Sequence, residues 1–136
     1  MAKSTFFICL LCFFITFYSC SDKNQLIGKW DDNIKLSAKT VDFEATADSV
    51  IVTTEGECWW VTHVSVNNEF FHVSQDIDIE SDNYSFSQNC FVVERRNKHT
   101  LFIKVDENPL STQRIIVVEL EAGDYFDRVT ITQAAK

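Results

Sequence analysis

From residue 34 onward, apolar and polar residues alternate with a period of two. The alternating segments are separated by polar turns and cover residues 34–36, 41–45, 50–52, 58–66, 69–80, 90–95, 100–105, 114–120 and 128–132. No window of helical length carries apolar residues at positions i, i+3, i+4 and i+7. Short strands at near-regular spacing predict one all-β domain, a sandwich or a barrel, over residues 34–136.

A turn at Asn67-Asn68 fixes the register of a long hairpin made of residues 58–66 and 69–80. A two-residue turn places His63 opposite His72, and strict alternation then gives the hairpin one core face and one water face. Its core face joins apolar residues of the C-terminal strands. The predicted core is Trp60, Val64, Phe71, Val73, Ile77, Leu101, Ile103, Ile116, Val118, Val129 and Ile131.

The water face of this hairpin is the candidate ligand surface, with Trp59, Phe70, His63, His72 and Asp76 predicted to be exposed. An aromatic ring stacks on the apolar face of a sugar, and carboxylates accept hydrogen bonds from hydroxyl groups. The pattern therefore predicts a shallow platform for a saccharide or a peptide. The alternative is that a loop or the N-terminal strand covers Trp59 and that the acidic residues form a solvated edge.

Other chemistry finds little support in the sequence. The two histidines alone fall short of the three or four protein ligands of a zinc site. The run from Asp76 to Glu80 alternates with isoleucine and lacks the glycine around which a calcium loop bends. The chain has no G-x-S-x-G, no H-E-x-x-H and no glycine-rich phosphate loop. We therefore expect no metal, no cofactor and no enzymatic activity.

The N-terminus has the pattern of a secretory signal. Lys3 precedes an uncharged apolar run of 12 residues, from Phe6 to Phe17, whereas a membrane-spanning helix needs roughly 20. Ser19-Cys20 then resembles a lipobox, so residues 1–19 are predicted to be cleaved and Cys20 to carry the lipid. Residues 20–33 would be the lipidated cysteine and a polar tether. Ordinary cleavage without lipidation is the alternative.

Composition and charge limit the partners. Hydrophobic residues make up 46% of the 136 residues, which is enough for a folded core. The formal net charge of −8 argues against nucleic acid as a partner and against a second, electrostatic contact with a membrane.

The C-terminal third resembles the BACON domain (Bacteroidetes-associated carbohydrate-binding, often N-terminal). The resemblance lies in LFIKVDENPLSTQRIIVVEL at 101–120 and GDYFDRVTITQ at 123–133: a strand followed by an asparagine, an arginine opening the next strand, and a final Thr-Ile-Thr-Gln. Leu36-Ser37 and Trp59-Trp60 fit further upstream. Two departures are Phe91, where the family usually has a second tryptophan, and a longer segment 61–90.

The resemblance implies an immunoglobulin-like β-sandwich of about 7–9 antiparallel strands. It also implies a surface lipoprotein of Gram-negative bacteria, displayed on the outer membrane and often linked to glycan use, but no set of binding residues. We expect a non-enzymatic module that binds a glycan or glycoprotein, or that acts as a spacer for envelope partners. The alternative is a structural subunit that docks to envelope proteins through a sheet edge. A protease inhibitor or immunity-type lipoprotein is supported only by size and fold.

Cys58 and Cys90 are predicted not to form a disulfide. The hairpin register places Cys58 opposite Ile77 and therefore in the core, whereas alternation around Cys90 is ambiguous. The resemblance gives Phe91 a buried position, which turns Cys90 the other way, and a bridge requires converging Cβ vectors. The oxidising environment of an exported protein favours the opposite outcome.

Overall fold

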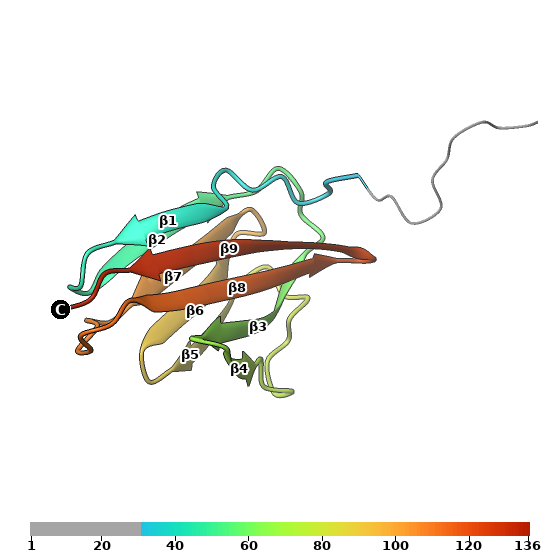
Figure 1. The fold of residues 1–136 in the computed structure, drawn as a ribbon. Coiled ribbons are helices and arrows are strands. Elements are labelled where there is room, and N and C mark those ends of the chain that lie inside the picture. Colours follow the sequence, from blue (N-terminus) through green and yellow to red (C-terminus); the bar gives the residue numbers. More distant parts are fainter. Residues whose placement is uncertain (1–30) are drawn as a thin grey trace, which may run out of the picture.

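The computed structural model describes residues 31–136, which fold into nine strands in two packed sheets (Figure 1). The strands are β1 (Thr40–Phe43), β2 (Asp48–Thr53), β3 (Trp60–Val66), β4 (Glu69–His72), β5 (Tyr84–Gln88), β6 (Phe91–Arg96), β7 (Thr100–Val105), β8 (Arg114–Ala122) and β9 (Tyr125–Gln133). The signal segment, Cys20 and most of the predicted tether lie outside the described residues. Nothing within residues 31–136 is a helix long and apolar enough to cross a membrane.

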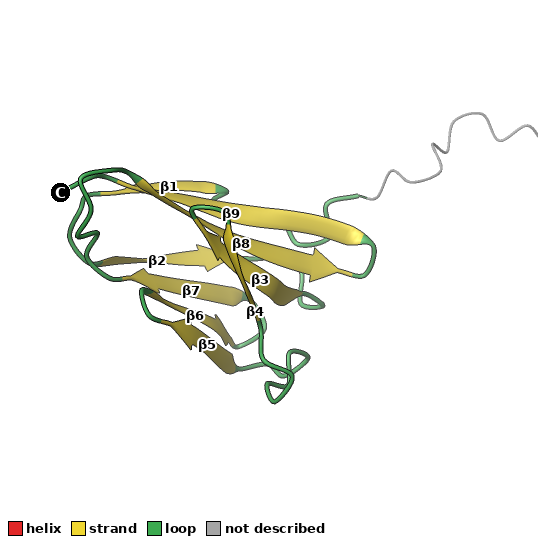
Figure 2. Cartoon of the chain, turned by 60° about the horizontal axis from the view of Figure 1, so that its bottom comes forward, coloured by secondary structure: helices red, strands yellow, loops and turns green. Residues whose placement is uncertain are grey.

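The first sheet has the order β1-β9-β8-β3-β4 and the second has the order β2-β7-β6-β5. Seen from another side, the two sheets lie as separate layers (Figure 2). The predicted immunoglobulin-like β-sandwich is therefore confirmed. One strand pair departs from the expected antiparallel pattern, because β1 runs parallel to β9. Parallel pairing is open to these two strands because most of the chain, rather than a tight turn, connects them.

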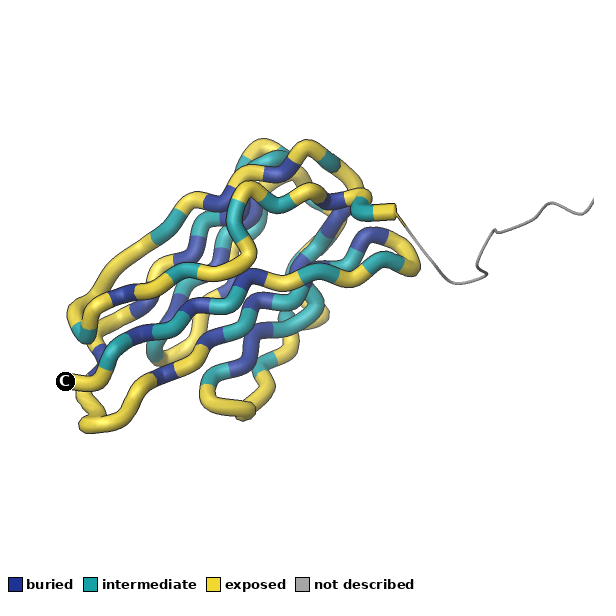
Figure 3. The backbone as a smooth tube through the Cα atoms, turned by 45° about the horizontal axis from the view of Figure 1, so that its top comes forward, coloured by how far each residue is buried: buried dark blue, intermediate teal, exposed yellow. Residues whose placement is uncertain are grey.

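The core lies between the sheets, and its residues alternate with outward residues along the strands (Figure 3). Most of the predicted core is confirmed, since Val64, Leu101, Ile103, Ile116, Val118, Val129 and Ile131 are fully buried. Phe71, Val73 and Ile77 are only half-buried and pack against the edge of the core. The prediction that Trp60 lies in the core is wrong, because Trp60 faces outward and Trp59 takes the core position.

A β-bulge explains the exchange of the two tryptophans. The hairpin turn is as predicted, with Asn67 and Asn68 at φ 48° and 69° and with His63 paired to His72. Between Val61 and His63, however, the register of β3 against β8 shifts by one residue. The extra residue, Thr62, inverts the alternation on its N-terminal side. Trp59 and Val61 therefore point into the core.

The strand predicted over residues 69–80 ends at His72, and residues 73–83 form a loop of short turns. The Ile77 N–H donates to the Ser74 carbonyl (3.0 Å), and the Ser81 N–H donates to the Asp78 carbonyl (3.2 Å). Farther along β3, the Val61 N–H donates to the Tyr84 hydroxyl (2.8 Å). This donor therefore has a partner from the other sheet, and β4 does not extend alongside it.

Within the part of the chain that the structure describes, Cys58 and Cys90 are both free thiols. Cys58 is exposed, so the prediction that it points into the core is wrong, because the bulge at Thr62 inverts its position too. Phe91 is buried as expected, and Cys90 is half-buried in the turn before β6. Cys58 follows Glu57, whose carbonyl accepts a hydrogen bond from Arg95 near the far end of β6. Five residues of strand span roughly 16 Å, well beyond the 7 Å or so that a disulfide allows between Cα atoms.

Candidate functional site

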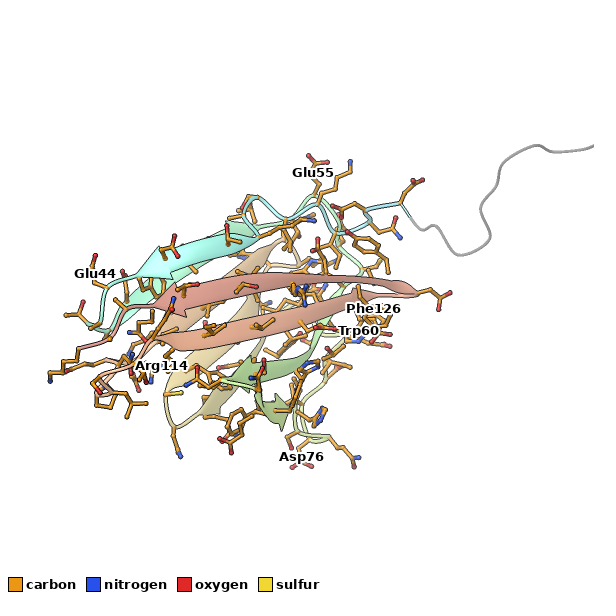
Figure 4. The ribbon with its side chains drawn as sticks, in the orientation of Figure 1. Glu44, Glu55, Trp60, Asp76, Arg114 and Phe126 are labelled. Carbon is orange, nitrogen blue, oxygen red and sulfur yellow. The ribbon has the colours of Figure 1, made fainter. Side chains whose placement is uncertain are left out.

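The outer face of the first sheet carries a row of aromatic residues at one end. Trp60 on β3 is opposite Glu121 on β8, and Glu121 is opposite Phe126 on β9. We call Trp60, Glu121 and Phe126 the aromatic row. Figure 4 shows the two labelled rings near the β8–β9 turn, and Phe126 is 57% exposed. Their strands are two positions apart, so the backbones are about 10 Å apart.

The next row on the same face is polar and contains His72, His63, Glu119 and Arg128 in register order. The His63 and His72 ring centroids are 5.7 Å apart, and His63 Nε2 lies 4.0 Å from a carboxylate oxygen of Glu119. The ring of Phe70 lies 5.2 Å from that of His63. The fold therefore brings Phe70, His63 and His72 together on the outer face, as the hairpin register predicts.

Two depressions border the aromatic row. One, of about 330 Å³, is lined by Glu119, Phe126, Asp127 and Arg128. The other, of about 470 Å³, lies between the start of β3 and the loop after β4, where Trp60, Val73, Ile77 and Ile79 line it. The aromatic row and the polar row beside it thus form a shallow, mixed surface that combines apolar ring faces with groups that donate and accept hydrogen bonds.

Trp59 cannot belong to this surface, because it is 1% exposed. Its indole N–H donates to Thr54 Oγ1 (3.0 Å) and to the Gly56 carbonyl (3.1 Å), and the Arg95 guanidinium lies 4.8 Å from its ring. The prediction that Trp59 faces water is therefore wrong. Asp76 is exposed, but it lies in the loop after β4 rather than on the sheet, because β4 ends early.

Arg95 is the most unusual residue at this end of the sandwich, because it is charged and 4% exposed. Its guanidinium donates to the carbonyls of Ser81 (2.9 Å), Glu80 (3.3 Å) and Glu57. These bonds hold the loop before β3 against the loop before β5. A depression of about 360 Å³ opens above them, lined by Glu57, Cys58, Trp59, Trp60, Glu80, Asp82, Arg95 and Lys98. Alternation places Arg95 on an inward position, but nothing in the sequence identifies its three carbonyl partners.

A buried polar network occupies the opposite end, and it consists of residues on which the BACON resemblance depends. Arg114 donates to the Gln133 side-chain oxygen through Nε (3.0 Å) and Nη2 (2.6 Å), and also to the Asp106 carbonyl. The Gln133 amide donates to the carbonyls of Ala45, Thr46 and Asp106. Asn108, fully buried, donates to the carbonyls of Thr112 and Ala134, both at 2.9 Å. These residues hold chain segments together.

The comparisons with known proteins identify a fold and no family. No family model matches the chain, and no curated protein matches it. The NMR structure of a protein from Bacteroides thetaiotaomicron is similar, with a TM-score of 0.63 and 19% identity over 79% of this chain and 92% of that chain. At this identity the likeness shows the sandwich fold alone.

A second similar structure is the CsuC–CsuE chaperone–tip adhesion subunit complex from archaic chaperone-usher Csu pili of Acinetobacter baumannii. It has a TM-score of 0.38 and 10% identity over 76% of this chain and 57% of that chain, and we infer nothing from it. The BACON resemblance stays a prediction. Within residues 31–136, no three histidine, cysteine or acidic side chains are grouped so that they could hold a metal ion.

Proposed function

We propose that this protein is a non-enzymatic, lipid-anchored surface module of the BACON type that binds a glycan or glycoprotein through its aromatic row. The observation that supports the proposal is the placement of Trp60 and Phe126 on one outer face, on either side of Glu121. Flat rings on a sheet form a rigid platform for the apolar faces of sugar rings. Glu121 between them would accept hydrogen bonds from hydroxyl groups.

The polar row beside the aromatic row supplies the remaining contacts in this proposal. Arg128 donates hydrogen bonds, Glu119 accepts them, and His63 can do either, depending on its tautomer. Such contacts orient a hydroxyl-rich ligand, whereas the rings supply most of the contact area. A spacer without a ligand would need neither ring on this face, so the aromatic row favours binding over a purely mechanical role.

Screening the full chain in detergent against a glycan array tests the proposal. We expect a defined set of saccharides to bind, with about tenfold or greater loss of affinity in both Trp60→Ala and Phe126→Ala, equivalent to roughly 1.4 kcal/mol or more. The matched control is Ile51→Ala, which removes an exposed apolar side chain from β2 in the second sheet. Absence of binding, or equal loss in all three variants, would contradict the proposal.

The anchor is tested separately. We expect the wild-type chain to partition into the detergent phase and to be degraded when intact cells are treated with protease. Cys20→Ala removes the thiol to which the lipid would attach, so this variant should remain unprocessed or be released in soluble form. A wild-type chain that is recovered without lipid would refute the anchor, and complete protection from protease would place the domain on the inner side of the outer membrane.

A further inference from the structure

The edge strand β5 differs from the other edge strands of the two sheets. Each of the others contains a charged residue, namely Asp42 in β1, Asp48 in β2 and Glu69 in β4. Charges and short length are the usual protection against pairing between sheet edges. The sequence of β5, Tyr-Ser-Phe-Ser-Gln, has no charge and no proline. β5 is short, with five residues, but it lacks the protection of a charge, although the whole chain carries a net charge of −8.

Within residues 31–136, the backbone groups of β5 lack a partner strand at two positions. The Asp106 N–H donates to the Cys90 carbonyl (2.9 Å), so the even-numbered residues of β6 bond to β7 and the odd-numbered ones to β5. In the β5–β6 register, Phe86 lies opposite Val93, and this pair is therefore hydrogen-bonded. Ser85 and Ser87 alternate with Phe86. Their N–H and C=O groups consequently point away from β6, toward the open edge.

The sequence around this edge is nearly palindromic. Residues 83–89 read Asn-Tyr-Ser-Phe-Ser-Gln-Asn, with Phe86 at the centre. If two copies paired antiparallel about Phe86, Ser85 of one copy would lie opposite Ser87 of the other, and Asn83 would lie opposite Asn89. Both serines expose their backbone groups, so each would donate and accept one main-chain bond with its counterpart. Opposed serine hydroxyls also form favourable cross-strand pairs.

We propose that a second copy of this chain is the partner of β5, forming a two-fold symmetric dimer in which the two four-stranded sheets join into one. The interface is isologous, as closed two-fold dimers require, because the same residues act on both sides. Two short strands bury less than the 1,200–2,000 Å² or so of a stable interface, so the dimer is weak in dilute solution. Because β5 belongs to the second sheet, this dimer leaves the aromatic row free, and the inference does not rest on saccharide binding.

Introducing charges of either sign at Ser85 and Ser87 tests the pairing and its register. The full chain in detergent is examined by sedimentation equilibrium up to the millimolar range. Wild type should show a monomer–dimer equilibrium, and S85K/S87K and S85E/S87E should each weaken association by about tenfold, because like charges then face each other. An equimolar mixture of the two variants should regain at least the wild-type affinity. The control S49K/I51K places the same added charge on β2, at the other edge of the same sheet, and should dimerise like wild type.

Both serine side chains are exposed, so these variants should fold, which far-UV circular dichroism checks. A wild-type chain that stays monomeric over the whole range would overturn the proposal. Two other results would also overturn it. One is that S85K/S87K associates as strongly as wild type, and the other is that folded S85K/S87K and S85E/S87E stay monomeric when they are mixed.

Discussion

Replacement of Trp59 by alanine is expected to lower the free energy of unfolding by about 3–5 kcal/mol, the range for large aromatic residues in a core. The indole is 1% exposed, so its loss removes nearly all of its buried apolar area and leaves a cavity between the sheets. Its hydrogen bonds to Thr54 and Gly56 disappear as well, and Arg95 loses the ring that it covers. Since domains are stable by only about 5–15 kcal/mol, this is a large fraction of the total.

The matched variant is Trp60→Ala, which removes the same side chain one residue along the chain. Trp60 faces outward beside Glu121 and is only half-buried, so its replacement should cost about 1 kcal/mol. Urea denaturation followed by far-UV circular dichroism measures both variants, because tryptophan fluorescence would itself change with the substitution. The position of the bulge at Thr62 would be refuted if Trp59→Ala lost less than about 1 kcal/mol of unfolding free energy, or if Trp60→Ala lost more than Trp59→Ala.

Three further predictions concern the interior. Gln133→Ala should cost about 1.5–3 kcal/mol in urea denaturation, because it removes hydrogen bonds to the charged Arg114; an unchanged midpoint would contradict the network. Tyr84→Phe should cost about 1–3 kcal/mol, because the Val61 N–H loses its acceptor. Burial raises the pKa of Tyr84, so the wild type should lose stability as the pH rises above about 10, and this loss should be smaller in Tyr84→Phe. In the native protein, mass-spectrometric mapping of alkylation should find fast labelling of the exposed Cys58 and slow labelling of Cys90, whose thiol pKa is raised by burial; equal rates would contradict these positions.

Period-two alternation was sufficient to predict an all-β sandwich or barrel and most of the core, whereas the choice of an immunoglobulin-like sandwich came from the BACON resemblance. Strands near the C-terminus follow it without interruption, and Val129 and Ile131 are buried as the pattern requires. The hairpin turn was also predictable, because Asn67 and Asn68 tolerate positive φ. Pairings that follow from this turn, such as His63 with His72, are therefore correct.

The bulge could not be predicted, because no glycine marks it and the sequence around Thr62 alternates plausibly in either phase. Two adjacent tryptophans make the ambiguity complete, since either one can fill the core position. The residue at which β4 ends could not be predicted from the sequence either. Residues 73–80 keep the pattern of a strand, but the Val61 N–H bonds to Tyr84, which belongs to the other sheet. Contacts between sheets decide both features.

The candidate site was only partly predictable for a related reason. Phe70, His63 and His72 belong to one hairpin, so a local register places them correctly on the outer face. The aromatic row joins Trp60 to Phe126, which is far away in sequence and adjacent only through β8. A signal for Phe126 did exist, since the buried positions of Val129 and Ile131 turn the even-numbered residues of β9 outward.

The position of β9 in the first sheet limits when the domain can finish folding during synthesis. β9 is the last strand of the chain, yet it lies between β1 and β8, and within the described residues it is the only hydrogen-bonded neighbour of β1. During synthesis, β1 is made well before its partner, because paired residues such as Thr40 and Thr130 are about ninety positions apart in the sequence. Gln133, near the end of β9, also completes the hydrogen bonds to the carbonyls of Ala45 and Thr46. A chain that lacks β9 therefore leaves β1 without its partner strand and Arg114 without the side-chain oxygen of Gln133, so the first sheet is complete only once β9 is present.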